Sequence, residues 1–130
     1  MLSILVTDEG FHPWSLSAHG QAPLIIQGDD NPENVDLDTA INDLGGIIII
    51  EFPSSADGRG FSLAHHLRLQ GFAGQIFASG ALICDQYRHA RQSGFDGVLL
   101  NEAQAERMPE SHWQEQAKRV ELSYRDRIYA

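Results

Sequence analysis

The run Ile47-Ile48-Ile49-Ile50, followed by Glu51 and Phe52, restricts the fold more than any other stretch of this sequence. Consecutive β-branched residues favour an extended strand, and no polar residue alternates with these four. A strand without alternation is typical of a parallel sheet that helices cover on both faces. We therefore expect residues 47–52 to form a strand that is buried on both faces.

The segments after this strand alternate between helix and strand. Ser62 stands at the N-cap position of an expected helix that ends at Gly71. Asn101 and Gln104 have the spacing of an N-cap residue and its partner three positions later. The full expectation, in chain order, is strands at 2–6 and 24–26, an irregular stretch over 12–23, a helix from Asp36 to Gly45, the strand at 47–52, a helix over 62–71, a strand at 75–78, a helix over 82–94, a strand at 98–100, a helix over 113–120 and an extended stretch at 122–124.

Strand, helix, strand, helix and strand over residues 46–100 make two βαβ units in succession. Crossovers of this kind are right-handed in nearly all known sheets. The chain has 130 residues, which is the size of one ordinary domain. We therefore predict an α/β fold. Residues 1–130 form a single domain whose mostly parallel sheet is built from consecutive right-handed βαβ units, with short N-terminal strands added.

The charge is strongly acidic and unevenly distributed. The chain has 9 Lys plus Arg and 18 Asp plus Glu, a formal net charge of −9, and its first basic residue is Arg59. All of the charged side chains in residues 1–58 are therefore carboxylates. Nucleic acid is excluded as a partner, because its binding draws on Lys and Arg that meet phosphates. An acidic surface serves solubility in general, and it also steers a domain toward a basic protein partner.

Cysteine and histidine usage excludes several classes of site. The single cysteine, Cys84, rules out an internal disulfide and a multi-cysteine zinc or iron–sulfur centre. The adjacent His65 and His66 point about 100° apart on a helix, so they do not chelate one metal ion. We predict no metal site.

The chain has no stretch of about 20 apolar residues and no basic signal-peptide start, so we expect a cytoplasmic protein that is not bound to a membrane.

Three loops are expected at the carboxyl ends of the parallel strands, where α/β sheets collect ligands. They cover residues 53–60, 79–80 and 101–102. In the first, Gly58 and Gly60 allow close approach of a ligand to the backbone, and Arg59 provides a fork suited to carboxylate, sulfate or phosphate. The alternative is structural, because Arg59 can instead pair with Asp57 or Asp85 and hold the loops together. The loop matches neither the phosphate-binding loop nor the dinucleotide fingerprint.

Cys84 and Glu51 are two further residues with reactive side chains. Cys84 falls in the first turn of an expected helix, where the helix dipole favours a thiolate, while Asp85 opposes it. A small core residue is the more common role of a lone cysteine. Glu51 interrupts an apolar strand, and an ion pair with Arg59 or Arg88 is the structural interpretation. No catalytic residue can be assigned from these patterns.

Residues 51–64 resemble the hallmark of the bacterial domain-of-unknown-function family 934 (DUF934). The matching stretch contains Glu51-Phe52-Pro53 and then Ala56-Asp57-Gly58-Arg59-Gly60-Phe61-Ser62-Leu63-Ala64. A second block, Asp85-Gln86 with Arg91-Gln92-Ser93-Gly94-Phe95-Asp96, is similar to the second conserved block of the family. The chain departs from the usual family pattern at Ala81, where the family has Asp, and at Cys84, where it has Arg. The resemblance leaves these site candidates: Asp57, Gly58, Arg59, Gly60, Ser62, Asp85 and Gln86.

The resemblance also implies a functional context. Members of the family tend to be encoded beside the sulfite reductase haemoprotein, and they are often labelled as oxidoreductases. The resemblance therefore implies a sulfur-assimilation context. Together with the acidic first half and the Gly58-Arg59-Gly60 loop, it leads us to expect an accessory protein of assimilatory sulfite reduction that binds a small oxyanion and docks on the reductase or another sulfur-assimilation enzyme. The alternative is a small oxidoreductase acting on a sulfur compound. No flavin, nicotinamide or haem fingerprint is present, so no cofactor is predicted. An uncovered edge strand invites pairing with another chain, so we expect a homodimer formed through an edge strand or through the aromatic C-terminal tail.

Overall fold

The structure is a computed structural model that describes residues 3–14, 24–28, 46–54 and 58–118. Its elements are β1 (Ser3–Thr7), β2 (Gly10–Trp14), β3 (Leu24–Gln27), β4 (Ile47–Phe52), α2 (Arg59–Leu69), β5 (Gln75–Gly80), the 3-10 helix η3 (Cys84–Gln86), α3 (Tyr87–Ser93), β6 (Gly97–Leu100) and α4 (Glu102–Arg107). Residues 110–118 form a further helix. The predicted helix at 36–45 and the extended stretch at 122–124 lie outside the described residues. No helix in the described part is long and apolar enough to cross a membrane.

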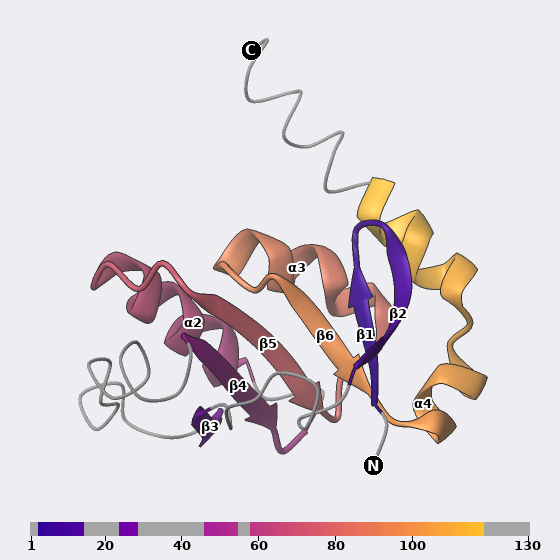
Figure 1. The fold of residues 1–130 in the computed structure, drawn as a ribbon, viewed down its shortest axis with the longest axis horizontal. Helices are drawn as coiled ribbons and strands as arrows, with labels where there is room; N and C mark the ends of the chain where they lie inside the picture. Colours follow the sequence, from indigo (N-terminus) through magenta and orange to yellow (C-terminus); the bar gives the residue numbers. More distant parts are fainter. Residues whose placement is uncertain (1–2, 15–23, 29–45, 55–57, 119–130) are drawn as a thin grey trace, which may run out of the picture.

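The strands form one six-stranded sheet in the order β2-β1-β6-β5-β4-β3 (Figure 1). β3, β4, β5 and β6 run parallel to one another, whereas β1 is antiparallel to both β2 and β6. The chain moves one strand along the sheet at each crossover, always in the same direction, so α2 and α3 lie on the same face. The predicted α/β fold, with a mostly parallel sheet and short N-terminal strands added, is confirmed.

β4 is buried on both faces, as its composition predicts. Ile48 and Ile50 are fully buried in the large cluster that the sheet shares with its helices. Ile47 and Ile49 point to the opposite face and are 7% and 5% exposed. The smaller cluster on that face also contains Trp14, Phe77 and Leu99. β4 therefore contributes to both hydrophobic clusters.

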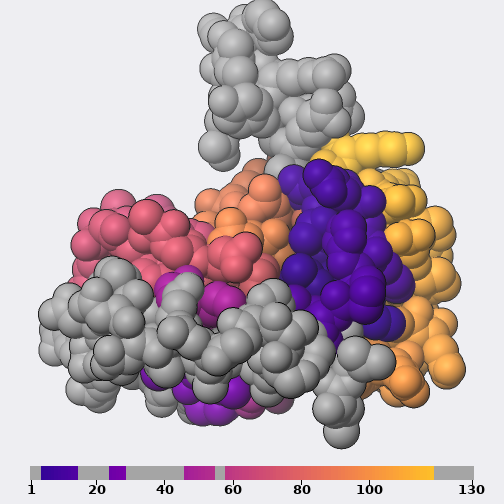
Figure 2. Space-filling model, in the orientation of Figure 1, coloured from indigo at the N-terminus to yellow at the C-terminus, as the bar shows by residue number. Residues whose placement is uncertain are grey.

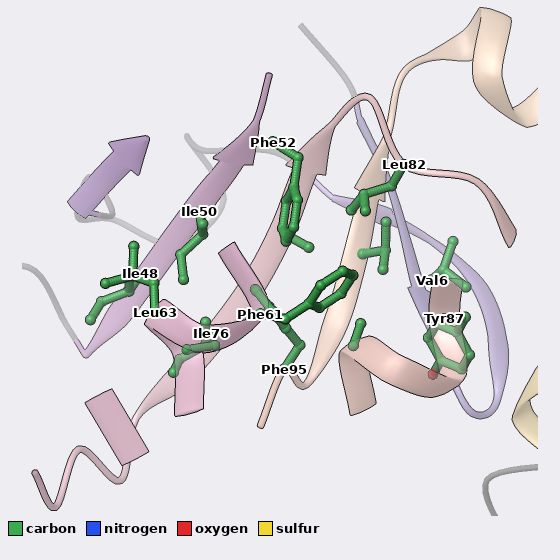
Figure 3. Packing of buried hydrophobic residues seen from close by; sticks show 14 of the residues in the cluster. Val6, Ile48, Ile50, Phe52, Phe61, Leu63, Ile76, Leu82, Tyr87 and Phe95 are labelled. Atoms are coloured by element: carbon green, nitrogen blue, oxygen red, sulfur yellow. The ribbon is translucent and has the colours of Figure 1, made fainter. Parts of the chain in front are cut away.

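Aromatic packing fixes α2 against the end of β4 (Figure 3). The ring of Phe52, the last residue of β4, lies 4.9 Å from the ring of Phe61 in α2 and 5.9 Å from that of Phe95, between centroids. All three rings are at most 5% exposed. Because Phe61 is in the first turn of α2, this contact also holds the preceding loop close to the carboxyl end of β4.

The predicted irregular stretch is wrong for residues 12–14, which belong to β2. Pro13 lies within this strand although proline has no N–H to donate to a neighbour. β2 is an edge strand of the described sheet, and its one neighbour among the described strands is β1, where Ile4 lies opposite Pro13. Proline is tolerated at such an edge, since its missing donor need not face another strand.

Helix boundaries differ from the prediction at three places. The helix expected over 113–120 begins at residue 110, and its described part ends at 118. α2 begins at Arg59, with Gly58 as its N-cap, because the N–H of Phe61 already donates to the carbonyl of Gly58 at 3.2 Å. Ser62 is therefore an exposed residue inside the first turn and not the N-cap. The helix expected over 82–94 begins as the 3-10 turn η3 and continues as α3, which ends at Gly94 with a φ of +111°.

The predicted N-cap of α4 is confirmed. The side chain of Asn101 accepts a hydrogen bond from the N–H of Gln104 at 2.9 Å, and Gln104 accepts one from the N–H of Asn101 at 3.1 Å. These reciprocal bonds satisfy two backbone donors at the start of the helix.

The free edge of β2 is covered in part by the helix at 110–118. Figure 2 shows the indigo hairpin of β1 and β2 lying against the residues coloured orange and yellow. The N–H of Phe11 donates to the Glu110 carboxylate at 2.7 Å. This bond occupies one of the donors with which an exposed edge strand recruits another chain.

A buried tyrosine ties the turn of this hairpin to α3. The hydroxyl of Tyr87 donates to Oδ1 of Asp8 at 2.5 Å, and Arg91 donates to the same carboxylate at 3.1 and 3.2 Å. The ring of Tyr87 packs edge-on against Trp113, 6.0 Å between centroids. Burial of Tyr87, together with its hydrogen bond to Asp8 and the negative charge of that carboxylate, raises the pKa of Tyr87 above its ordinary value.

The free energy of unfolding is expected to fall as the pH rises above the ordinary tyrosine pKa of about 10. In that range the unfolded chain loses the proton of Tyr87, whereas the folded chain keeps it, so deprotonation favours unfolding. The slope is at most about 1.4 kcal/mol per pH unit for this one group. Urea unfolding of the wild type and Tyr87→Phe between pH 8 and 11 measures it.

Cys84 contributes to the same pH dependence in the same direction, because its pKa is also raised. Cys84→Ser is therefore the matched control that separates the two groups. We expect Tyr87→Phe to have a flatter stability profile than Cys84→Ser above pH 10. Equal slopes in the wild type and Tyr87→Phe would contradict the assignment.

Candidate functional site

The loops that follow β4, β5 and β6 meet at one edge of the sheet, as predicted. The N–H of Ala81, which follows β5, donates to the carbonyl of Phe52 at the end of β4, at 3.0 Å. The Nε2 of Gln104 in α4 donates to the carbonyl of Gly80, the last residue of β5, at 2.7 Å. These two bonds join the described parts of the three loops into one continuous edge.

The first of these loops leads into the N-terminus of α2. Gly58 is the N-cap of this 11-residue helix and has no side chain with which to cap it. Arg59 is the first helical residue and is exposed, and the first turn contains no acidic residue. The positive end of the helix dipole and a guanidinium group therefore lie together at this point.

The two glycines of this loop have different roles. A Cβ on Gly60 would lie 2.5 Å from the ring of Phe52, so the close packing of α2 on β4 requires a glycine there. Gly58 has an ordinary φ of −86°, and no described atom lies within 4 Å of the place where its Cβ would be. Neither backbone strain nor contact with the described residues accounts for the glycine at position 58.

The remaining predicted residues of this loop are placed as follows. Asp57 lies outside the described residues, so its predicted pairing with Arg59 stays a prediction. Ser62 is exposed in the first turn of α2, at the same end of the helix as Arg59. The structure thus brings Gly58, Arg59, Gly60 and Ser62 together on a single turn.

The second group of candidates lies on η3, after β5. The side chain of Gln86 accepts a hydrogen bond from the N–H of Ile83 at 3.0 Å, which caps this short helix. Asp85 is exposed, and its Oδ1 lies 3.9 Å from the sulfur of Cys84. The capping bond is a local structural role for Gln86.

Cys84 is not activated as a nucleophile. Burial raises the pKa of its thiol, and the neighbouring charge of Asp85 raises it further. The expected effect of a helix dipole is small here, because η3 has only three residues. Cys84 is half-buried, and its N–H donates to the sulfur of Met108 at 3.3 Å.

Glu51 lies beside an amide that sequence reasoning did not consider. Its Oε2 accepts a hydrogen bond from Nε2 of Gln27 at 3.2 Å, across the parallel pair β3–β4. The register also places Ser79 of β5 next to Glu51 on the same face of the sheet. This row was missed because the alignment of three strands separated by 24 and 28 positions is set by the tertiary structure.

Most of the second block of the DUF934 resemblance stabilises the fold at the amino ends of β5 and β6, away from the loops described above. Arg68 donates to Asp96 at 2.9 Å and to the carbonyl of Gly94 at 2.8 and 2.9 Å. Asp96 also accepts the N–H of Ile76 at 2.9 Å. Arg91 holds Asp8, as described above. These contacts account for the arginine, glycine and aspartate of the block without a ligand.

A protein metal site requires several His, Cys, Asp or Glu side chains grouped around one point. In residues 3–14, 24–28, 46–54 and 58–118, no three or more His, Cys, Asp or Glu side chains are grouped so that they could hold a metal ion. His89 of α3 instead stacks on the ring of Phe61 at 4.1 Å between centroids.

Comparison with known proteins gives one match. The profile of a bacterial protein family of unknown function, DUF934, matches residues 24–129 of the 130-residue chain. No curated protein and no solved structure matches the chain significantly. The matched range includes both blocks on which the sequence resemblance rests.

Proposed function

The chain belongs to the bacterial DUF934 family of unknown function, and we propose that it is an accessory protein of assimilatory sulfite reduction that binds a small oxyanion at the start of α2. The sulfur context rests on the family resemblance described above. The oxyanion is bound by backbone N–H groups at the first turn of α2 and by the side chains of Arg59 and Ser62, with Arg59 as the principal ligand. The same proposal has the protein dock on a sulfite reductase or another sulfur-assimilation enzyme.

The first turn of α2 carries this proposal. Its positive dipole end, the Arg59 side chain and the absence of an acidic residue in that turn all favour an anion. A cation at a helix N-terminus costs about 0.3–1 kcal/mol in the free protein, and a bound anion offsets this cost. Gly58 leaves room at the N-cap for an oxyanion to approach the backbone N–H groups.

Sulfite, sulfate or phosphate is therefore expected to raise the melting temperature of the protein at constant ionic strength. A ligand at about 100 times its dissociation constant adds about 2.7 kcal/mol, which corresponds to roughly 10 °C for a domain of this size. Arg59→Gln and Gly58→Ala should both reduce the shift, because they remove the guanidinium group and fill the space at the N-cap. Thermal unfolding followed by circular dichroism makes the measurement.

Arg107→Gln is the matched control. Arg107 is also an exposed arginine, but it lies in α4 and its described hydrogen bond is a long one to its own helix. Arg107→Gln should leave the melting-temperature shift caused by inorganic oxyanions unchanged. An equal shift in the wild type and Arg59→Gln would contradict the proposed site, as would the absence of a shift with all three anions.

Docking is tested by mixing the protein with the purified sulfite reductase haemoprotein. A net charge of −9 favours a partner with a basic surface, and such an association weakens as salt is added. Size-exclusion chromatography at low and high salt should show a complex only at low salt. Unchanged elution of both proteins at micromolar concentration and low salt would contradict the docking.

A further inference from the structure

A half-open hollow lies between the loop that follows β5 and the C-terminal part of α4. Its volume is about 370 Å³, within the range of protein pockets that bind small molecules. It lies beyond the carboxyl ends of β5 and β6, at the edge where α/β sheets bind ligands. Its lining residues are Ala81, Leu82, Ile83, Gln104, Arg107 and Met108.

The two walls of the hollow are already held together in the free protein. Gln104 is 8% exposed, and its amide group is engaged by Gly80 and Asn101. The sulfur of Met108 accepts the N–H of Cys84 at 3.3 Å, which joins the α4 side of the hollow to the β5 side. A ligand therefore meets a preformed site, and the polar atoms of Gln104 are already used.

Apolar side chains form most of the lining. Leu82 is 3% exposed and belongs to the main core, whereas Ile83 is 45% exposed. Ile83 is one of three large hydrophobic residues of the described part that are exposed to this extent. A ligand with an apolar body would remove this side chain from water, which is favourable.

Among the described residues that line the hollow, Arg107 provides the one charged side chain. Within the described residues its hydrogen bond is from Nε to the carbonyl of Ala103, at 3.4 Å, in its own helix. Its two Nη atoms have no acceptor among the residues that the structure describes. A guanidinium group in this state is suited to receive two oxygens of a carboxylate or sulfonate.

We infer that this hollow binds a small organic anion that has an apolar body and one carboxylate or sulfonate head. The body covers Leu82, Ile83 and Met108, and the head pairs with the Nη atoms of Arg107. The site is separate from the oxyanion site proposed at α2. It uses different loops, and it requires an apolar body that an inorganic oxyanion lacks.

Octane-1-sulfonate is the probe, and amide chemical shifts of the full chain are the readout. Titration should shift the amides of residues 81–84 and 104–108. Arg107→Gln should raise the dissociation constant roughly 10-fold, because a hydrogen-bonded ion pair is lost. Inorganic sulfate at the same concentration and ionic strength should leave these amides in place.

Position 81 offers a matched pair of variants. Ala81 is exposed and lines the hollow, so Ala81→Asp and Ala81→Asn add side chains of the same size, and only the aspartate is charged. Ala81→Asp should weaken binding at least about 3-fold more than Ala81→Asn, because the added carboxylate repels the sulfonate and competes for Arg107. Arg59→Gln should leave the probe-induced shifts of residues 81–84 and 104–108 as they are in the wild type, whatever its effect on amides at the start of α2.

Three results would overturn the inference. One is amide shifts confined to other parts of the chain. Another is an unchanged dissociation constant in both Arg107→Gln and Ala81→Asp, with folding verified by the spectrum of each free variant. The third is a response to inorganic sulfate equal to that to octane-1-sulfonate, because the apolar body would then contribute nothing. None of these results depends on the α2 site, so the two proposals fail separately.

Discussion

Replacing Gly80 with alanine is expected to lower the free energy of unfolding by about 3 kcal/mol or more. Gly80 ends β5 with a φ of +93°, a conformation that costs an alanine about 1–2 kcal/mol. The added Cβ would also lie 2.4 Å from the carbonyl oxygen of Phe52 and 3.0 Å from its nitrogen. Urea unfolding followed by circular dichroism measures the loss.

The backbone around Gly80 has little freedom to move away from the added atom. The carbonyl of Phe52 is held by the N–H of Ala81 at 3.0 Å, and that of Gly80 by Gln104 at 2.7 Å. A shift that relieves the clash weakens at least one of these bonds. We therefore expect the strand-end edge, which includes both proposed sites, to be disturbed in the variant.

Gly71→Ala is the control that separates backbone strain from the clash. Gly71 has nearly the same φ, +96°, but no described atom lies within 4 Å of its Cβ position. It should lose only the strain, about 1–2 kcal/mol. Equal losses in Gly71→Ala and Gly80→Ala would show that the strand end absorbs the clash.

The second large effect is expected at Arg68. Its guanidinium group makes five hydrogen bonds, to the carbonyls of Phe72 and Gly74, twice to that of Gly94, and to the carboxylate of Asp96, all between 2.7 and 3.0 Å. The two charged side chains are 25% and 41% exposed, so solvent screens part of their attraction. Arg68→Met should cost about 2–3 kcal/mol, chiefly because the carbonyls of the loops lose their donors.

Arg107→Met is the matched control, since Arg107 is an exposed arginine near the end of a helix and its described hydrogen bond is a single long one. It should change stability by less than about 0.5 kcal/mol. Asp96→Asn should give an intermediate loss, because it removes the charge and keeps an acceptor for Ile76. If Arg68→Met were no less stable than Arg107→Met, the bonds of Arg68 would contribute nothing.

The chemistry of individual residues was enough to predict the main elements of the fold. Four isoleucines without polar alternation predicted the doubly buried β4. The short period of helix and strand after it predicted α2, β5, α3 and β6 in the correct order. The N-cap of α4 followed from Asn101 and Gln104. In each case the signal is local, because it depends on residues a few positions apart.

The ends of helices and the edge strands were harder to predict from the sequence. Residues 12–14 were expected to be irregular but belong to β2, where the effect of Pro13 depends on whether a neighbouring strand lies on its donor side. Ser62 was favoured as the N-cap by its side chain, yet the packing of Phe61 on Phe52 places the start of α2 three residues earlier. Both errors concern residues whose role is decided by a partner distant in the sequence.

The candidate site shows the same difference between local signals, which could be predicted, and contacts between distant residues, which could not. Sequence reasoning identified the Gly58-Arg59-Gly60 loop, and the structure then distinguished Gly60, which packing requires, from Gly58, which it does not. It also assigned Gln86 to a cap, and it assigned Asp96 and Arg91 to contacts that hold the fold. The hollow beside Arg107 was not predicted, because its walls come from the loop after β5 and from α4, which meet only in the folded chain.

Burial pattern and capping act over a few residues, so residue chemistry along the chain was sufficient to predict the type and order of the main helices and strands. Which distant side chains meet is set by the tertiary fold: Tyr87 with Asp8, Arg68 with Asp96, Gln27 with Glu51, and Arg107 with an apolar hollow. These encounters depend on strand order and register. In a sheet, a shift of one residue moves every side chain to the opposite face, so local patterns do not predict which distant residues share a site.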